Sequence, residues 1–271
     1  MMKINRRYLL NAGSSLLAFA ALAQRAQRAV GLTGAASMTG LMASRGPANA
    51  ADIHRILLIN PNSNQATTDM MVQIAQSAAS DDIEIVGATA PHSPPMIVDP
   101  EALAASAPQV VEIGLALSKD VSGIIISAFG DPGIANLRRQ VSVPVVGIAE
   151  AAMLAASDKG RRFGVATTTP KLVASIDARA VELGLGQLYT GTRLTSEDPN
   201  KLVADPGRLV EALRQVVSTC IELDKAEAVI IGGGPLGNAA TALTPMFSIP
   251  VIALIPAAVR RQIEILRLVR K

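Results

Sequence analysis

The sequence is poor in the residue types that build disulfides, metal sites and stacking surfaces. Its 271 residues include one cysteine, two histidines, no tryptophan and only 2% aromatic residues. A single cysteine excludes a disulfide within the chain, and no spacing of cysteines and histidines is typical of a metal site. So few aromatic side chains argue against a surface that stacks on nucleic-acid bases or sugars. The sequence therefore predicts no metal and no internal disulfide.

Acidic residues are absent from the first 50 residues, which carry a disproportionate share of the positive charge. This segment holds one lysine and five arginines, and removing these six charges from the net charge of +3 leaves −3 for the rest. The high isoelectric point of about 9.2 therefore belongs to the N-terminal segment. A basic face of the kind that binds nucleic acid is not expected on the remainder, so we predict no nucleic-acid partner.

The N-terminal segment is similar to an export signal. Residues 5–10 read Asn-Arg-Arg-Tyr-Leu-Leu, which resembles the twin-arginine signal, and an apolar run over residues 9–23 follows. Of two small-x-small cleavage sites, the one after Ala50 lies directly before the first expected strand. We therefore expect residues 1–50 to be a leader and the mature protein to be periplasmic or exported.

Two further points concern this leader. Polar residues interrupt its apolar run, so a permanent membrane span is not expected. The alternative to export is a true start codon further downstream, near Met38 or Met42, which would make the protein cytoplasmic. The single cysteine does not decide between these compartments.

Short apolar runs alternate with helical segments along the rest of the chain, which is typical of an α/β protein with parallel sheets. Such runs suit strands that are buried on both faces. Turns rich in glycine, proline or short polar residues follow most of them. The expected strands cover residues 56–60, 83–88, 121–126, 145–148, 163–167, 229–231 and 251–255, with a further short strand and a loop within 186–200; the expected helices cover 67–79, 101–117, 134–140, 170–183, 207–223 and 256–270.

The chain contains an internal duplication. Residues 121–152 and 226–258 share the order strand, glycine- and proline-rich turn, short helix, Ser-x-Pro and second strand. We therefore expect two pseudosymmetric α/β halves, residues 51–160 and 161–271, with one site where their strand ends face each other. Whether the last strand or helix crosses to the other half is left open. Chance similarity between generic βαβ units is the alternative.

Polar residues follow the first strand at the edge where an α/β sheet binds ligands. Asn62, Ser63 and Asn64 lie between this strand and the next helix. Such residues cap helices, and the free N–H groups of a helix start attract anions. Capping explains one or two of them, whereas three in succession favour binding of a carboxylate.

Three segments together resemble the Asp/Glu/hydantoin racemase superfamily. They are Ile-Asn-Pro-Asn-Ser at residues 59–63, Phe-Gly-Asp-Pro-Gly at 129–133 and Val-Val-Gly-Ile-x-Glu-Ala-Ala at 145–152. The resemblance covers nearly all of residues 55–258. It implies two pseudosymmetric halves with a ligand between them. It also implies racemisation, without a cofactor, at a carbon next to a carboxylate or amide carbonyl.

The sequence departs from this family at the groups that move protons. Inversion of a stereocentre without pyridoxal phosphate requires a base on one face of the carbon and an acid on the other. The resemblance places the two cysteines of the family at Ala128 and Gly233, and neither residue carries a proton. Cys220 is no substitute, because it is expected inside the helix that precedes a strand.

Most of a binding site nevertheless remains. Backbone N–H groups in the glycine turn at residues 232–234 and near Phe129 are placed to receive a carbonyl or enolate oxygen. The glycine turn lacks the spacing of a dinucleotide fingerprint, and no cofactor is predicted. The predicted ligand-binding residues are Asn62, Ser63, Asn64, Ser127, Phe129, Thr167, Thr168, Gly233 and Gly234.

Three ionisable residues are candidates for acid–base chemistry, each with a structural alternative. Asp131 follows a glycine and precedes a proline, as a turn residue does. Glu150 opens a helix, where it either caps that helix or holds the opposite loop. His92 lies in an irregular loop, residues 89–97, that is either a lid over the site or an ordinary surface loop.

Three functions are therefore consistent with the sequence. The first is racemase-like isomerisation at the α-carbon of an amino acid or derivative. The second is a related isomerase or decarboxylase that uses other acid–base groups or bound water. The third is an exported, non-catalytic binder of small carboxylates. All three predict a small carboxylate or amino-acid-like ligand, and the resemblance also implies a homo-oligomer.

Overall fold

The computed structural model describes residues 53–269, so the predicted leader and its cleavage site lie outside the described residues. The first half contains one parallel sheet with the strand order β2-β1-β3-β4. Its strands are β1 (His54–Asn60), β2 (Ile83–Thr89), β3 (Gly123–Ile126) and β4 (Val145–Gly147), and its helices are α2 (Gln65–Ala78), α3 (Pro100–Leu117), α4 (Ile134–Arg138) and α5 (Ile148–Ala156).

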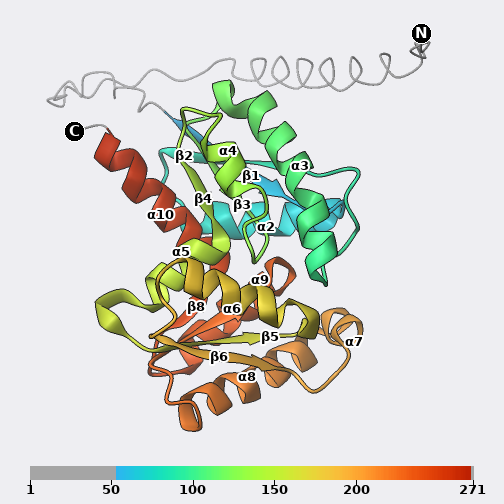
Figure 1. Cartoon of the computed structure of the whole chain (residues 1–271), viewed down its shortest axis with the longest axis vertical. Helices are drawn as coiled ribbons and strands as arrows, with labels where there is room; N and C mark the ends of the chain where they lie inside the picture. The colour runs from blue at the N-terminus through green and yellow to red at the C-terminus, as the bar shows by residue number, and fades with distance from the viewer. Residues whose placement is uncertain (1–52, 270–271) are drawn as a thin grey trace, which may run out of the picture. The chain divides into compact units, whose positions relative to one another are not determined.

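The second half repeats this topology with a parallel sheet of strand order β6-β5-β7-β8 (Figure 1). The repeated order confirms the expected α/β fold of two similar halves. The strands are β5 (Phe163–Thr167), β6 (Tyr189–Leu194), β7 (Ala228–Gly232) and β8 (Val251–Ala253), and the helices are α6 (Val173–Glu182), α7 (Pro199–Ala204), α8 (Pro206–Glu222), α9 (Gly237–Leu243) and α10 (Leu254–Val269).

The central strands are buried on both faces, as their apolar runs predict. Every residue of β3, β5 and β7 is buried. In the first sheet Ile59 pairs with Ile126, and in the second Thr167 pairs with Gly232. Within each sheet the two central strands thus end within one residue of each other, which places the residues that follow them at one edge.

The last helix of each half packs against the other half. Helix α10 contacts α2, α5 and the first sheet, and Figure 1 shows it beside the first half, while α5 contacts β7 and β8. Gln262 of α10 is fully buried and donates to the Pro144 carbonyl at 3.3 Å. A Cβ at Gly123 would lie 1.9 Å from Gln262 Nε2, so only glycine leaves room for this contact. The two halves therefore share a core.

The structure differs from the sequence prediction mainly at two elements. Residues 199–204 form α7, although only a strand and a loop were expected there. Strand β8 ends at Ala253, two residues earlier than predicted, because α10 begins directly at Leu254. Both Leu254 and Ile255 are buried, and a short apolar run does not distinguish a strand from a buried helix start.

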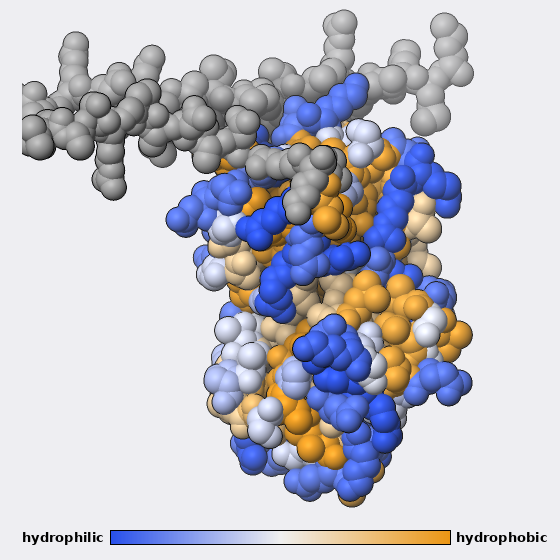
Figure 2. Space-filling view, turned by 90° about the vertical axis from the view of Figure 1, so that its left-hand side faces the viewer, coloured by the Kyte–Doolittle hydropathy of each residue, from blue (hydrophilic) through white to orange (hydrophobic). Residues whose placement is uncertain are grey.

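Hydrophobic and hydrophilic residues are unevenly distributed over the surface of the described residues. On the face shown in Figure 2, hydrophobic residues reach the surface near the junction of the halves, and the lower end is mainly hydrophilic. Within residues 53–269, none of the helices has both the length and the apolar composition needed to cross a bilayer.

Candidate active site

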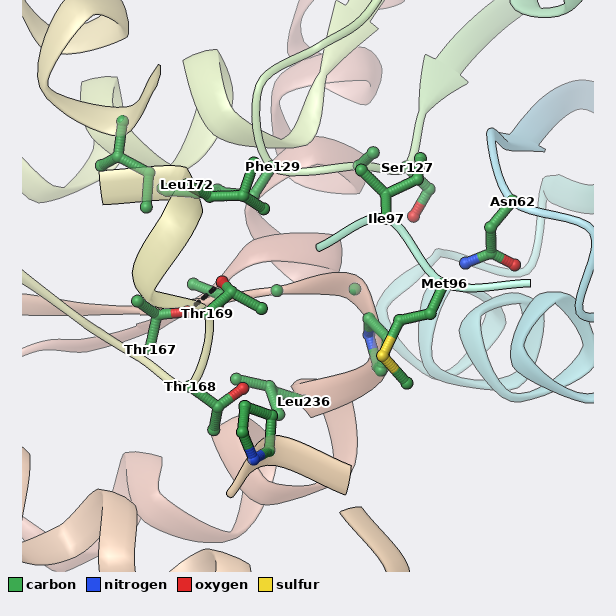
Figure 3. Close-up of a pocket in the computed structure, with 17 residues that line it drawn as sticks. Asn62, Met96, Ile97, Ser127, Phe129, Thr167, Thr168, Thr169, Leu172 and Leu236 are labelled. Atoms are coloured by element: carbon green, nitrogen blue, oxygen red, sulfur yellow. Dashed lines mark hydrogen bonds between the residues drawn. The ribbon is translucent and has the colours of Figure 1, made fainter. Parts of the chain in front are cut away.

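A cavity of about 60 Å³ lies between the two halves, at the carboxyl ends of the central strands (Figure 3). A single water needs about 10–15 Å³ by the same measure, so the cavity suits a small ligand rather than a polymer. None of the described residues that line it has an ionisable side chain. The lining residues are Asn62, Met96, Ile97, Ser127, Ala128, Phe129, Thr167, Thr168, Thr169, Leu172, Ile176, Pro199, Gly232, Gly233, Gly234, Pro235 and Leu236.

The turn after β3 forms the wall that the first half contributes. The Ser127 N–H donates to the Ile59 carbonyl at 2.8 Å, which continues the sheet for one more residue. Phe129 is buried and reaches the second half, since a Cβ at Gly232 would lie 3.4 Å from its ring. Ala128, between them, is half-buried and faces the cavity.

The turn after β7 forms the opposite wall. Gly233 has φ 137° and ψ 127°, a backbone conformation that strongly favours glycine. A Cβ at Gly234 would lie 3.3 Å from the Ser127 carbonyl oxygen and 3.1 Å from Met71 Sδ. The two turns therefore touch, and Ala128 and Gly233 line the same cavity as the duplication predicts.

Neutral hydrogen-bond donors point into this cavity from both halves. Asn62 Oδ1 accepts from Asn60 Nδ2 at 2.8 Å and from the Asn64 N–H at 2.9 Å, which leaves Asn62 Nδ2 facing the cavity (Figure 3). The Thr168 hydroxyl has no hydrogen-bond partner among residues 53–269 and also lines the cavity. Thr167 is committed elsewhere, because its hydroxyl donates to the Gly232 carbonyl at 2.7 Å.

Backbone N–H groups add to these donors. Those of Ala128, Phe129, Gly233 and Gly234 donate to no other backbone group within the described part of the chain. They occur as two equivalent pairs, one on each wall. Paired N–H groups of this kind can hold a carboxylate, a carbonyl oxygen or an enolate oxygen.

Two predicted binding residues lie outside the cavity. Asn64 is exposed and caps α2, where its side chain accepts from the Thr67 N–H at 3.1 Å. Ser63 does not line the cavity, and its N–H donates to the Pro94 carbonyl at 3.1 Å. Capping therefore explains Asn64, and Asn62 is the member of this turn that reaches the ligand space.

Sequence reasoning missed most of the apolar side of the cavity. The loop at 89–97 contributes Met96 and Ile97, in keeping with its predicted position over the site. Leu172 and Ile176 come from the start of the α6 region, and Pro199 comes from the unpredicted α7. Their only sequence signal is apolar character at the start of a helix, which is equally typical of a core position.

The three ionisable candidates lie away from the cavity lining. The carboxylate of Asp131 is buried and accepts from the N–H groups of Ala149 and Glu150, each at 2.9 Å. It also accepts from Arg179 Nη2 at 3.1 Å, and Arg179 Nη2 contacts Glu150 Oε2 at 3.1 Å. His92 is exposed on the loop. Asp131 and Glu150 thus bind a helix start and an arginine rather than the ligand space.

Burial dominates the electrostatics of Asp131. Desolvation raises the pKa of its carboxyl to about 6, against the opposing effects of Arg179 and of the two backbone donors at the start of α5. Asp131 has φ 49°, a left-handed conformation that is uncommon outside glycine. Asp131 therefore anchors the turn that follows β3, through its contacts with the start of α5 and with Arg179.

Cys220 should be unreactive in the folded protein. It is fully buried on α8, and burial raises the pKa of its thiol to about 12, so almost no thiolate forms near neutral pH. Ellman's reagent should detect no thiol in the native protein and one per chain in concentrated guanidinium chloride. Rapid modification of the native protein would contradict this burial.

Two parallel sheets of equal strand order, closed around one small cavity at their carboxyl ends, define a pseudosymmetric α/β protein of the racemase type. The family model described as Asp/Glu/Hydantoin racemase matches residues 56–261. The chain belongs to the Asp/Glu/hydantoin racemase family. It is therefore racemase-like, and by resemblance an isomerase.

Individual relatives agree with this assignment. Hydantoin racemase from Pseudomonas sp. (strain NS671) is 31% identical over 207 residues, which cover 76% of this chain and 83% of that protein. The structure of allantoin racemase from Klebsiella pneumoniae superposes with a TM-score of 0.75 at 29% identity, covering 79% of this chain and 88% of that one. The structure of allantoin racemase from Pseudomonas fluorescens superposes with a TM-score of 0.75 at 28% identity, covering 79% of this chain and 91% of that one.

Proposed function

We propose that the protein binds a small cyclic ureide or related amino-acid derivative and racemises it at the carbon next to its carbonyl group. One observation carries this proposal: residues whose N–H groups donate to no backbone acceptor among residues 53–269 line a single cavity from both strand ends, at Ala128 and Gly233. The named relatives act on hydantoin and allantoin. These are neutral rings with several carbonyl and N–H groups, which match the neutral donors of the cavity.

The chemistry follows from these donors. Removal of the α-proton leaves an enolate whose charge lies largely on the carbonyl oxygen, and fixed N–H groups stabilise that oxygen. Among residues 53–269 no ionisable side chain lines the cavity, so water or hydroxide takes the proton. Return of a proton from water to either face of the carbon completes racemisation, with no net change in atoms or charge.

The lining also selects among ligands. Within the described part of the chain no lysine, arginine or histidine lines the cavity, so a second carboxylate, as in aspartate or glutamate, would be buried there without a counter-charge. Apolar residues, including Leu172, Ile176 and Leu236, instead accommodate an apolar substituent. Neutral rings or monocarboxylates are therefore preferred to dicarboxylates.

A second candidate function is a periplasmic or exported binder of small carboxylates or ureides, without catalysis. The lack of an ionisable side chain among the described lining residues favours it, and the twin-arginine-like leader supports export. The related isomerase or decarboxylase that uses Asp131, Glu150 or His92 has less support, because these three residues lie outside the lining.

Proton exchange distinguishes the two candidates. The purified protein is incubated in D₂O with single enantiomers of substituted hydantoins, allantoin and amino acids, and deuterium at the α-carbon and optical rotation are followed. The racemase predicts exchange above the buffer rate, whereas the binder predicts only thermal stabilisation by the ligand. Neither exchange nor stabilisation with any of these compounds would contradict both.

Two threonine variants control this experiment. Thr168→Val removes a cavity hydroxyl while keeping the shape of the side chain, and it should weaken ligand binding about threefold to tenfold. Thr241→Val changes an exposed position on α9 and should leave binding unchanged. Equal effects of the two variants would show that the ligand binds elsewhere.

A further inference from the structure

We propose that Arg179 is a positioning residue that holds the two walls of the cavity together. It lies on α6 of the second half, and its side chain is 15% exposed. Its guanidinium binds Asp131 Oδ2 through Nη2 at 3.1 Å and through Nε at 3.3 Å. The inference deepens the proposed function, because it concerns the same cavity, but it makes no use of the identity of the ligand.

Both partners of this ion pair belong to segments that line the cavity. Asp131 follows Phe129 by two residues in the turn that forms the first wall. Arg179 follows Ile176 by three residues, which is about one helical turn, and Ile176 lines the opposite side. The ion pair therefore joins one wall to the other just outside the ligand space.

A second contact makes this connection stiff. Arg179 Nη2 also binds Glu150 Oε2 at 3.1 Å, and Glu150 in turn contacts Arg138 Nη2 at 3.1 Å. Asp131 accepts from the two N–H groups at the start of α5, which includes Glu150. The turn after β3, the start of α5 and α6 are thus bound at one guanidinium, whose planar fork suits two carboxylates at once.

Space around Asp131 shows how closely these parts fit. A Cβ at Gly147 would lie 2.1 Å from Asp131 Cγ, so the end of β4 leaves room for the buried carboxylate only because residue 147 is glycine. Loss of Arg179 would leave the buried carboxylate without its cation. We therefore expect the turn at residues 127–133 to open away from α6 more often.

A cysteine placed in the cavity reports this opening. Ala128→Cys puts a thiol on the cavity wall, and the buried Cys220 should not react with the reagent. Ala128 is half-buried on the wall of a small cavity, so the bulky aromatic Ellman's reagent should react slowly with this thiol while the walls are closed and faster when they separate. In this background Arg179→Gln should speed modification about tenfold or more, as expected for loss of hydrogen bonds to charged groups.

Three further variants make the test specific. Arg179→Lys keeps the positive charge but not the planar fork, so the thiol should be modified at an intermediate rate. If the glutamine variant does not fold, the rate in the lysine variant tests the proposal. Glu182→Gln removes an exposed partner of the same arginine and should leave the rate unchanged. Val217→Ala destabilises the α8 core away from the cavity and should also leave the rate unchanged.

The outcomes separate positioning from general stability. An unchanged rate in both Arg179 variants would overturn the proposal, and so would an equal increase in Val217→Ala. No ligand enters the measurement, so failure of the exchange assay leaves this result valid. Conversely, failure here leaves the proposed racemisation untouched.

Discussion

Replacing Ala128 with cysteine should raise the rate of α-proton exchange in a bound ureide by at least about a hundredfold, the usual lower range for a positioned general base. Ala128 is half-buried on the cavity wall, so a thiol fits toward the ligand space. Nearby unpaired N–H groups stabilise the thiolate. Exchange in D₂O, followed by nuclear magnetic resonance, measures the gain.

A single thiol acts on one face of the carbon only. The thiol takes the α-proton, exchanges it with D₂O and returns a deuteron to the same face of the carbon, so the carbon is labelled without inversion. Deuterium incorporation should therefore exceed racemisation in the Ala128→Cys variant, and polarimetry on the same samples measures the ratio. Ala128→Ser is the matched control, because its hydroxyl has nearly the same size but far too high a pKa to act as the base. Equal rates for both variants would contradict the proposed placement of the reacting carbon.

Gly233→Cys should add little exchange activity, in contrast to Ala128→Cys. With φ at 137°, a side chain at this position costs on the order of 1–3 kcal/mol of backbone strain. Its Cβ would also lie 3.2 Å from Leu236 Cγ. The expected result is a less stable protein in chemical denaturation, with little gain in exchange.

Replacing Asp131 with alanine should lower the free energy of unfolding by about 3–5 kcal/mol, the usual cost of removing one partner from a buried ion pair. The carboxylate is buried, and its loss leaves Arg179 without this counter-charge. It also leaves two N–H groups at the start of α5 without their acceptor. Denaturation in urea, followed by circular dichroism, measures the change.

Two variants test the cause of this loss. Asp131→Asn keeps one acceptor oxygen and should cost less than alanine. Glu182→Gln removes an exposed carboxylate from the same arginine, and exposed ion pairs contribute little, so stability should hardly change. A loss in Asp131→Ala no larger than that in Glu182→Gln would show that the buried carboxylate is not an anchor.

The polar part of the site was largely predictable from the sequence. Ser127, Thr168 and Gly234 follow strands whose apolar runs are unambiguous, and parallel strands present their carboxyl ends at one edge. Asn64 shows the limit of this reasoning. A short polar side chain before a helix serves equally well as a cap or as a ligand donor, and only its direction in the fold distinguishes the two.

The apolar part of the site was not predictable in the same way. Leu172, Ile176 and Pro199 belong to elements whose apolar faces could equally pack on their own sheet. Asp131 likewise reads as a turn residue, and its partner Arg179 lies 48 residues further along the chain. No local pattern specifies contacts over such a separation.

The sequence by itself determined the strands, the duplication and the two corresponding positions, Ala128 and Gly233, at which the family resemblance predicts proton-carrying groups. These follow from hydrophobic periodicity and from residue identity, which act locally. Only the tertiary structure decided that the two turns touch, that α10 crosses to the first half and that Arg179 joins the walls. Such contacts arise when the two sheets close around a shared core, because burial of each face then depends on residues far away in the chain.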